Sequence, residues 1–132
     1  MKALTFLKII TGLNVLVSTG FALAGVVSPS LLLPANVTTD KAITIFALYA
    51  GARAVPIATV TIMSIFNKHW SAFITLAVLA GMMQVLDAFI GIYEHDLSKT
   101  AGPISIATIQ FAAIYWTIRR RPPRVPAETQ IF

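Results

Sequence analysis

The chain has 132 residues, of which 57% are hydrophobic and only 11% are charged, and its formal net charge is +5. This composition and a mean hydropathy of +0.81 exclude a water-soluble globular domain and indicate an integral membrane protein. The chain contains no cysteine, which excludes disulfides, thiol catalysis and thiolate metal sites.

The chain contains four apolar segments that are suited to crossing a bilayer, which takes about 20 apolar residues per helix. Their sequences lack the short alternating pattern of a membrane barrel, so helices are the remaining way to satisfy the backbone in lipid. We predict an all-α integral membrane four-helix bundle with short loops, formed by residues 1–120 as one domain and followed by a flexible tail at 121–132. The predicted spans are Leu4–Val27, Ile43–Phe66, Ser71–Tyr93 and Pro103–Ile118.

Basic residues gather near the two chain ends, at Lys2 and Lys8 and in the segment Arg119–Arg124. By the positive-inside rule, both termini are expected in the cytoplasm, which fits an even number of spans. We therefore expect a multi-pass protein of the bacterial inner (plasma) membrane, whose basic segment anchors lipid headgroups. That segment lacks a nucleic-acid-binding fold, so no nucleic-acid partner is expected.

In the first span, small and polar residues recur every three or four positions, which places them on one helix face. Such a face allows close helix packing in lipid, and its asparagine can hydrogen-bond across the interface. The residues are Thr11, Asn14, Ser18, Ala22 and Gly25.

In the second span, the spacing places Tyr49, Arg53 and Pro56 on one face. Pro56 removes a helical hydrogen bond and favours a kink, which releases a backbone carbonyl beside the arginine. Irregular backbone at membrane depth is tolerated where protein or a wet cavity receives it, so we expect a cavity here.

The third span predicts an inward seam with a seven-residue repeat, formed by Ala77, Ala80, Gln84, Asp87, Gly91 and Glu94. In the fourth span, Ser105, Thr108, Ala112 and Tyr115 form one stripe, and Gln110 falls nearly opposite Thr108. Two interpretations stay open: Gln110 faces a neighbouring subunit, or the stripe faces lipid.

Arg53 and Asp87 are opposite charges inside adjacent spans, where a charge persists only if it faces the bundle or finds a partner. Counting residues from the helix ends gives a depth difference of about 7 Å, which a guanidinium can bridge. We expect these two groups to meet. Either the pair fixes helix register, with Gln84 and Tyr49 completing its hydrogen bonds, or it lines a pocket that handles the polar group of a substrate.

Two short motifs resemble the DoxX-like superfamily of small four-helix membrane proteins, in particular its uncharacterised bacterial and fungal branches. They are Gly51-Ala52-Arg53 in the second span and Gly81, Gln84 and Asp87 in the third. The resemblance implies a four-helix bundle with both termini inside. In similar proteins an acidic residue often follows the arginine, whereas this chain has Ala54 there.

The first function we expect is that of a small membrane enzyme acting on a lipophilic small molecule by isomerisation, cyclisation or epoxide opening. Asp87 would transfer the proton and Arg53 would stabilise negative charge. The substrate would be oriented by Tyr49, Gln84, Asn14, Tyr93 and Glu94.

The alternatives are a non-catalytic accessory or assembly subunit and a small oligomeric proton-coupled transporter. Membrane lipid and a second copy of the chain are the other expected partners. A single histidine beside two acids, His95, is weak evidence for a metal, so we expect neither a metal nor a cofactor.

Overall fold

The computed structural model describes residues 2–33, 37–67 and 69–120, and within these ranges it contains four long α-helices. They are α1 (Lys2–Val27), α2 (Lys41–Phe66), α3 (Trp70–Tyr93) and α4 (Leu97–Arg119), with a short 3-10 helix, η1 (Pro29–Leu31), after α1. All four are long and apolar enough to cross a membrane. The predicted tail, 121–132, lies outside the described residues.

The helix ends are set by local hydrogen bonds. Asp40 accepts a hydrogen bond from the Ile43 amide at 2.8 Å and so caps α2. Asp96 caps α4 in the same way through the Ser98 amide at 2.9 Å. This cap starts α4 at Leu97, six residues before the predicted start, so Pro103 lies inside the helix.

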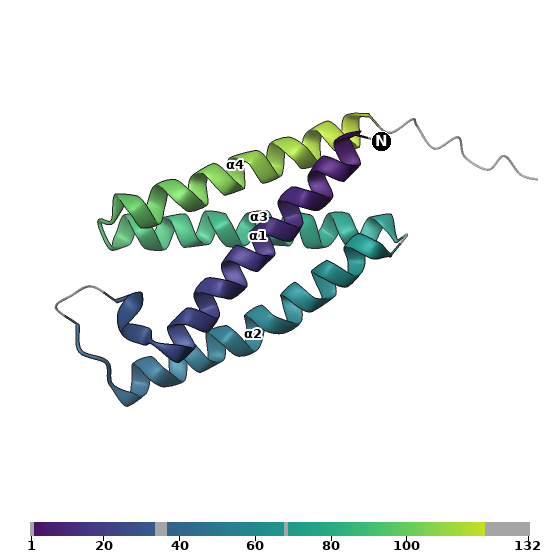
Figure 1. Cartoon of the computed structure of the whole chain (residues 1–132). Coiled ribbons are helices and arrows are strands. Elements are labelled where there is room, and N and C mark those ends of the chain that lie inside the picture. Colours follow the sequence, from purple (N-terminus) through teal and green to yellow (C-terminus); the bar gives the residue numbers. More distant parts are fainter. Residues whose placement is uncertain (1, 34–36, 68, 121–132) are drawn as a thin grey trace, which may run out of the picture.

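The bundle has two ends. The terminal end carries the start of α1, the end of α4 and the short connection from α2 to α3, and the two-loop end carries the other two connections. Figure 1 shows α3 and α4 side by side along their length, while α1 crosses over α3. Helix α2 meets α3 near the terminal end and diverges from it toward the two-loop end. As a result, α2 contacts α1 far more than α3.

Helices α1, α3 and α4 form most of the buried core. Its apolar centre lies at Leu7, Phe73, Ala77, Ala113 and Ile114, and a second cluster joins Val15, Ala58 and Ala80. The small-polar face predicted for α1 is confirmed, because Thr11, Asn14 and Gly25 are buried there. These small residues let the helices approach closely, as expected for packing in lipid.

The polar residues of α4 left two interpretations open, and the structure shows which side of the helix is buried. Gln110 is buried with Ala107, Ala113 and Thr117. Because the other stripe lies on the opposite side of the same helix, it is exposed; its members are Ser105, Thr108, Ala112 and Tyr115. Gln110 therefore faces the bundle core and not a neighbouring subunit, and the stripe faces outward.

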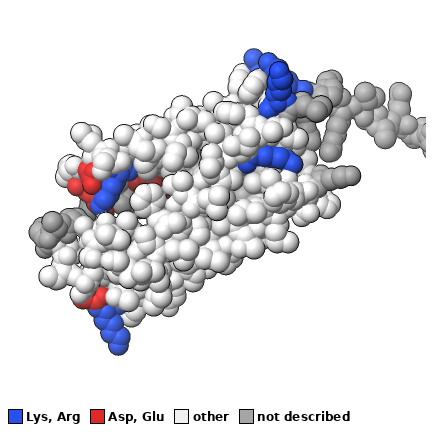
Figure 2. Space-filling model, viewed as in Figure 1, with Lys and Arg blue, Asp and Glu red and all other residues white. Residues whose placement is uncertain are grey.

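Charged side chains gather at the two ends of the molecule, and the face in Figure 2 shows a wide, largely uncharged belt between them. Lys2, Lys8, Arg119 and Arg120 belong to the terminal ends of α1 and α4. Asp40, Lys41, Glu94, Asp96 and Lys99 belong to the two-loop end. A bilayer would match the apolar belt with its hydrocarbon region.

Candidate functional site: the opening between α2 and α3

The expected ion pair between Arg53 and Asp87 is wrong for this structure. Both residues are exposed, and the ion pairs among the described residues join Lys99 to Glu94 and to Asp96. The reason lies in α2, whose small residues pack inward while Arg53 lies beside that face. The inward residues of α2 are Gly51, Ala54, Ala58, Thr61 and Ser64.

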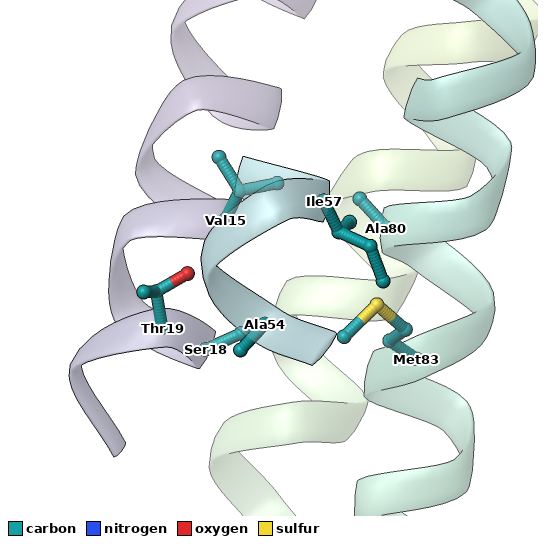
Figure 3. Close-up of a pocket in the computed structure, with 7 residues that line it drawn as sticks. All are labelled: Val15, Ser18, Thr19, Ala54, Ile57, Ala80 and Met83. Atoms are coloured by element: carbon teal, nitrogen blue, oxygen red, sulfur yellow. The ribbon is translucent and has the colours of Figure 1, made fainter. Parts of the chain in front are cut away.

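A small hollow lies where α1, α2 and α3 come together, and Figure 3 shows its lining. Its volume is about 10 Å³, which is room for about one water molecule. Ser18 and Thr19 of α1 supply the hydroxyl groups, and the other lining residues are Val15, Ala54, Ile57, Ala80 and Met83. Residues of both α2 and α3 line the hollow, so the two helices are still close together at this level.

Beyond this hollow α2 and α3 diverge (Figure 1), and we call this part of the two helices the opening; Arg53 and Asp87 belong to it. Arg53 precedes Ile57 by four residues on α2, and Asp87 follows Met83 by four residues on α3. Since the two helices are antiparallel, both steps lead one turn, about 6 Å, toward the two-loop end. Residues four apart share a helix face, so each charge lies on the side of its helix that lines the hollow. The hollow is lined by Ala54 and Ile57 of α2 and by Ala80 and Met83 of α3, so Arg53 lies near the level of Gln84. Asp87 therefore lies about three residues, roughly 4.5 Å, nearer the two-loop end than Arg53, in the order that the count from the helix ends predicts.

Two of the predicted binding residues, Asn14 and Gln84, are buried and bonded to each other. Gln84 donates to Asn14 Oδ1 at 2.7 Å and to Ser18 Oγ at 2.8 Å, and Asn14 Nδ2 donates to the Ala80 carbonyl at 3.2 Å. Their exposed fractions are 2% for Asn14 and 3% for Gln84. These amides join α1 to α3, as expected for Asn14, and Gln84 does not complete hydrogen bonds to Arg53.

A second amide connection lies nearer the terminal end, and the sequence analysis did not identify it. Gln110 Nε2 donates to Thr11 Oγ1 at 2.8 Å and to the Ala77 carbonyl at 3.1 Å, so it joins α4 to α1 and α3. Its Oε1 atom is buried without a hydrogen-bond partner. The spacing of Ala107, Gln110, Ala113 and Thr117 is the signal that could have placed this face inward.

The remaining predicted site residues do not converge on the opening. Tyr49 is 60% exposed on α2, and Tyr93 is exposed at the last position of α3. Glu94 lies in the connection after α3, where it pairs with Lys99. The structure thus brings together Asn14 with Gln84, and it places Arg53 and Asp87 at one opening without an ion pair.

Lys99 ties the two connections of the two-loop end together. Its Nζ atom donates to Glu94 Oε2 and to the Leu32 carbonyl, the latter at 2.8 Å. Beside it, hydrogen bonds from the Ser98 hydroxyl and from backbone amides lower the pKa of Asp96 below its ordinary value. This cluster holds the leucine-containing segment after η1 against the start of α4.

Over the described ranges, no three His, Cys, Asp or Glu side chains lie close enough together to hold a metal ion. Comparison with protein-family models, with curated proteins and with solved structures finds no match for this chain. The argument for function therefore starts from the opening between α2 and α3 and the two charges beside it.

Proposed function

We propose that this chain is a subunit of a membrane assembly and that it docks its partner at the opening between α2 and α3. The observation that carries the proposal is the exposure of Arg53 and Asp87 inside two membrane-crossing helices, with no ion pair between them. Each such charge costs about 2.5–3.5 kcal/mol at the centre of a membrane helix. A partner that brings the opposite charge offsets this cost.

The neutral polar groups support the same proposal. The amides of Asn14, Gln84 and Gln110 are used inside the bundle, where they join α1 to α3 and α4. The fold therefore does not need an ion pair between Arg53 and Asp87 to hold its helices together. A pair that folding does not use remains available for association.

The placement and membership of the chain are further proposals. We place both termini in the cytoplasm of a bacterium, with the protein in its inner membrane, because Lys2, Lys8, Arg119 and Arg120 lie at the terminal end. Arg119 and Arg120 lie over the rings of Tyr115 and Trp116 at 4.9 Å, an arrangement suited to the headgroup region. The two glycine-containing motifs favour a DoxX-like protein.

Neutralising the two charges tests the assembly proposal. The tagged chain, and the variants Arg53→Met and Asp87→Leu, would be extracted with their surrounding lipid and separated by native size. We expect the wild type to run as a complex and each variant to lose it. The matched control is Thr108→Val, a change on the exposed side of α4, which should keep the complex. A wild type that runs alone would contradict the proposal.

A second candidate is acid–base chemistry on a lipophilic small molecule, favoured by the position of both charges within about one turn of one hollow. The hollow holds about 10 Å³, so a substrate would have to bind outside it, against the exposed side chains of Arg53 and Asp87. Asp87 would transfer a proton and Arg53 would stabilise the negative charge that develops. The purified protein should then convert a component of a lipid extract, and Asp87→Asn should abolish the conversion. An unchanged extract would contradict this candidate.

A further inference from the structure

The positions of Arg53 and Asp87 also indicate which partner fits the opening. Each residue lies within about one turn of the same hollow, one on α2 and one on α3, and the two differ in depth by only about 4.5 Å. The surface beside them is apolar and exposed: Phe46 lies two turns from Arg53 on α2, and Ile90 lies three residues after Asp87 on α3. The opening thus presents one positive and one negative charge within an apolar face.

We propose that a second copy of this chain packs against this opening, with Arg53 of each copy paired to Asp87 of the other. The inference rests on the proposed assembly function and names its partner. Copies inserted in the same orientation are related by a two-fold axis along the membrane normal, which keeps every residue at its own depth. Reciprocal pairing therefore requires the arginine side chain to span the depth difference of about 4.5 Å, and Arg53 can do so because it leans toward the N-terminus of its helix, which is the level of Asp87. Planar guanidinium and carboxylate groups suit such a pair.

The paired surfaces are self-complementary in charge. A face with one arginine and one carboxylate matches a rotated copy of itself, because rotation exchanges the two positions. A face with a single charge would instead meet a like charge across the axis. Pairing also removes both charges from lipid and covers the exposed Phe46 and Ile90.

Two charge-reversal variants test this pairing. Arg53→Asp leaves two carboxylates at the opening, and Asp87→Arg leaves two guanidinium groups, so each variant should repel its own copies. When both are produced together with different affinity tags, each copy meets its opposite, and we expect the two tags to co-purify at wild-type yield. When one variant alone is produced with both tags, only like copies can meet, and the two tags should co-purify at one tenth of that yield or less. The combined variant Arg53→Asp with Asp87→Arg should restore self-association.

Crosslinking provides a measurement that does not depend on these charges. Because the chain has no cysteine, a single introduced thiol reports one position without background. Ala50→Cys, exposed on α2 beside the opening, should form a crosslinked dimer in native membranes, and Ile109→Cys on the outer side of α4 should not. Equal crosslinking at both positions would overturn the proposed face.

The outcomes separate this inference from the assembly proposal. If the two reversal variants do not co-purify although wild-type copies do, the reciprocal pairs are overturned, and repulsion within each copy explains the defect. A wild type that co-purifies with a different membrane protein, but not with its second copy, overturns the dimer and leaves the assembly function standing. A wild type that is alone and monomeric in native lipid overturns both.

Discussion

The seam where α1, α3 and α4 meet and the opening between α2 and α3 use polar residues in opposite ways. In the seam, Gln84 and Gln110 are buried and donate hydrogen bonds to neighbouring helices. At the opening, Arg53 and Asp87 are exposed and form no ion pair. Neutral amides thus hold this bundle together, whereas its intramembrane charges are left on its surface.

The difference follows from the cost of burying each kind of group. An amide that forms its hydrogen bonds can be buried in a membrane bundle at a net gain, about 0.6 kcal/mol per interhelical bond and up to about 1.7. Burying an ion pair removes two charges from water, and replacing such a pair with apolar residues is often neutral or stabilising. A fold therefore gains more reliable stability from the seam than from the charges.

The largest effect is expected at Gly91 of α3, which lies against the first turn of α4. A Cβ atom at Gly91 would lie 2.6 Å from Thr100 Oγ1 and 2.7 Å from the Lys99 carbonyl carbon and oxygen. Because backbone atoms must move, Gly91→Ala should lower the free energy of unfolding by about 1–3 kcal/mol. Unfolding in mixed micelles, followed by circular dichroism, measures this change.

Two other glycines serve as controls for this prediction. Gly20→Ala should be neutral or slightly stabilising, because a Cβ there has nothing within 4 Å. Gly51→Ala should fall between the two, since its Cβ would meet only the Val26 side chain, at 2.9 Å. If Gly91→Ala were as stable as Gly20→Ala, the close contact of α3 with α4 would be in doubt.

Breaking the amide connection of the seam should have the next largest effect. Gln84→Leu leaves Asn14 Oδ1 without its donor, so we expect a loss of about 1–2 kcal/mol in the free energy of unfolding. Combining it with Asn14→Ala should cost less than the sum, because one bond is lost in both variants. The control is Thr108→Val, whose exposed hydroxyl bonds its own helix. Strict additivity would argue against the Asn14 to Gln84 bond.

The four helices and the inner face of α1 could be predicted from sequence, because hydropathy and the spacing of small residues both depend on local pattern. The face of α3 was mostly predicted too, since Ala77, Ala80, Gln84 and Gly91 are all buried. The start of α4 was missed because the polar cap at Asp96 extends the helix beyond its apolar part. Local patterns thus predicted the helices better than they predicted where each helix begins and ends.

The place of Arg53 could not be predicted by the rule that membrane charges face inward. That rule holds for whichever surface is finally buried, and a single chain does not say whether that surface is internal or shared with a partner. In α2 the spacing of Gly51, Ala54, Ala58 and Thr61 was the better guide to the inner face.

A smaller effect is expected from the charges at the opening, once copies are separated by dilution in detergent. Arg53→Leu and Asp87→Leu should each change the monomer's free energy of unfolding by less than about 0.5 kcal/mol. Breaking an internal buried ion pair would instead cost about 3–5 kcal/mol. The same unfolding assay decides between these values. A loss of about 3–5 kcal/mol in either variant would show that Arg53 and Asp87 pair within one copy and hold its helices together.

The smallest effect is expected at the two-loop end, from the titration of Asp96. Hydrogen bonds from Ser98 and from the Lys99 amide lower the pKa of this carboxyl, so the folded state favours its charged form. The stabilisation is complete above about pH 4 and is lost as the pH falls through the lowered pKa. The protection factor of the Ser98 amide, which compares its exchange rate with that of an unfolded amide at the same pH, should therefore fall in acid, and Ser98→Ala should move that fall to higher pH by removing the largest cause. Asp96→Asn should abolish it, because an amide caps the helix without titrating. An acid response that survives Asp96→Asn would show that Asp96 is not the group responsible.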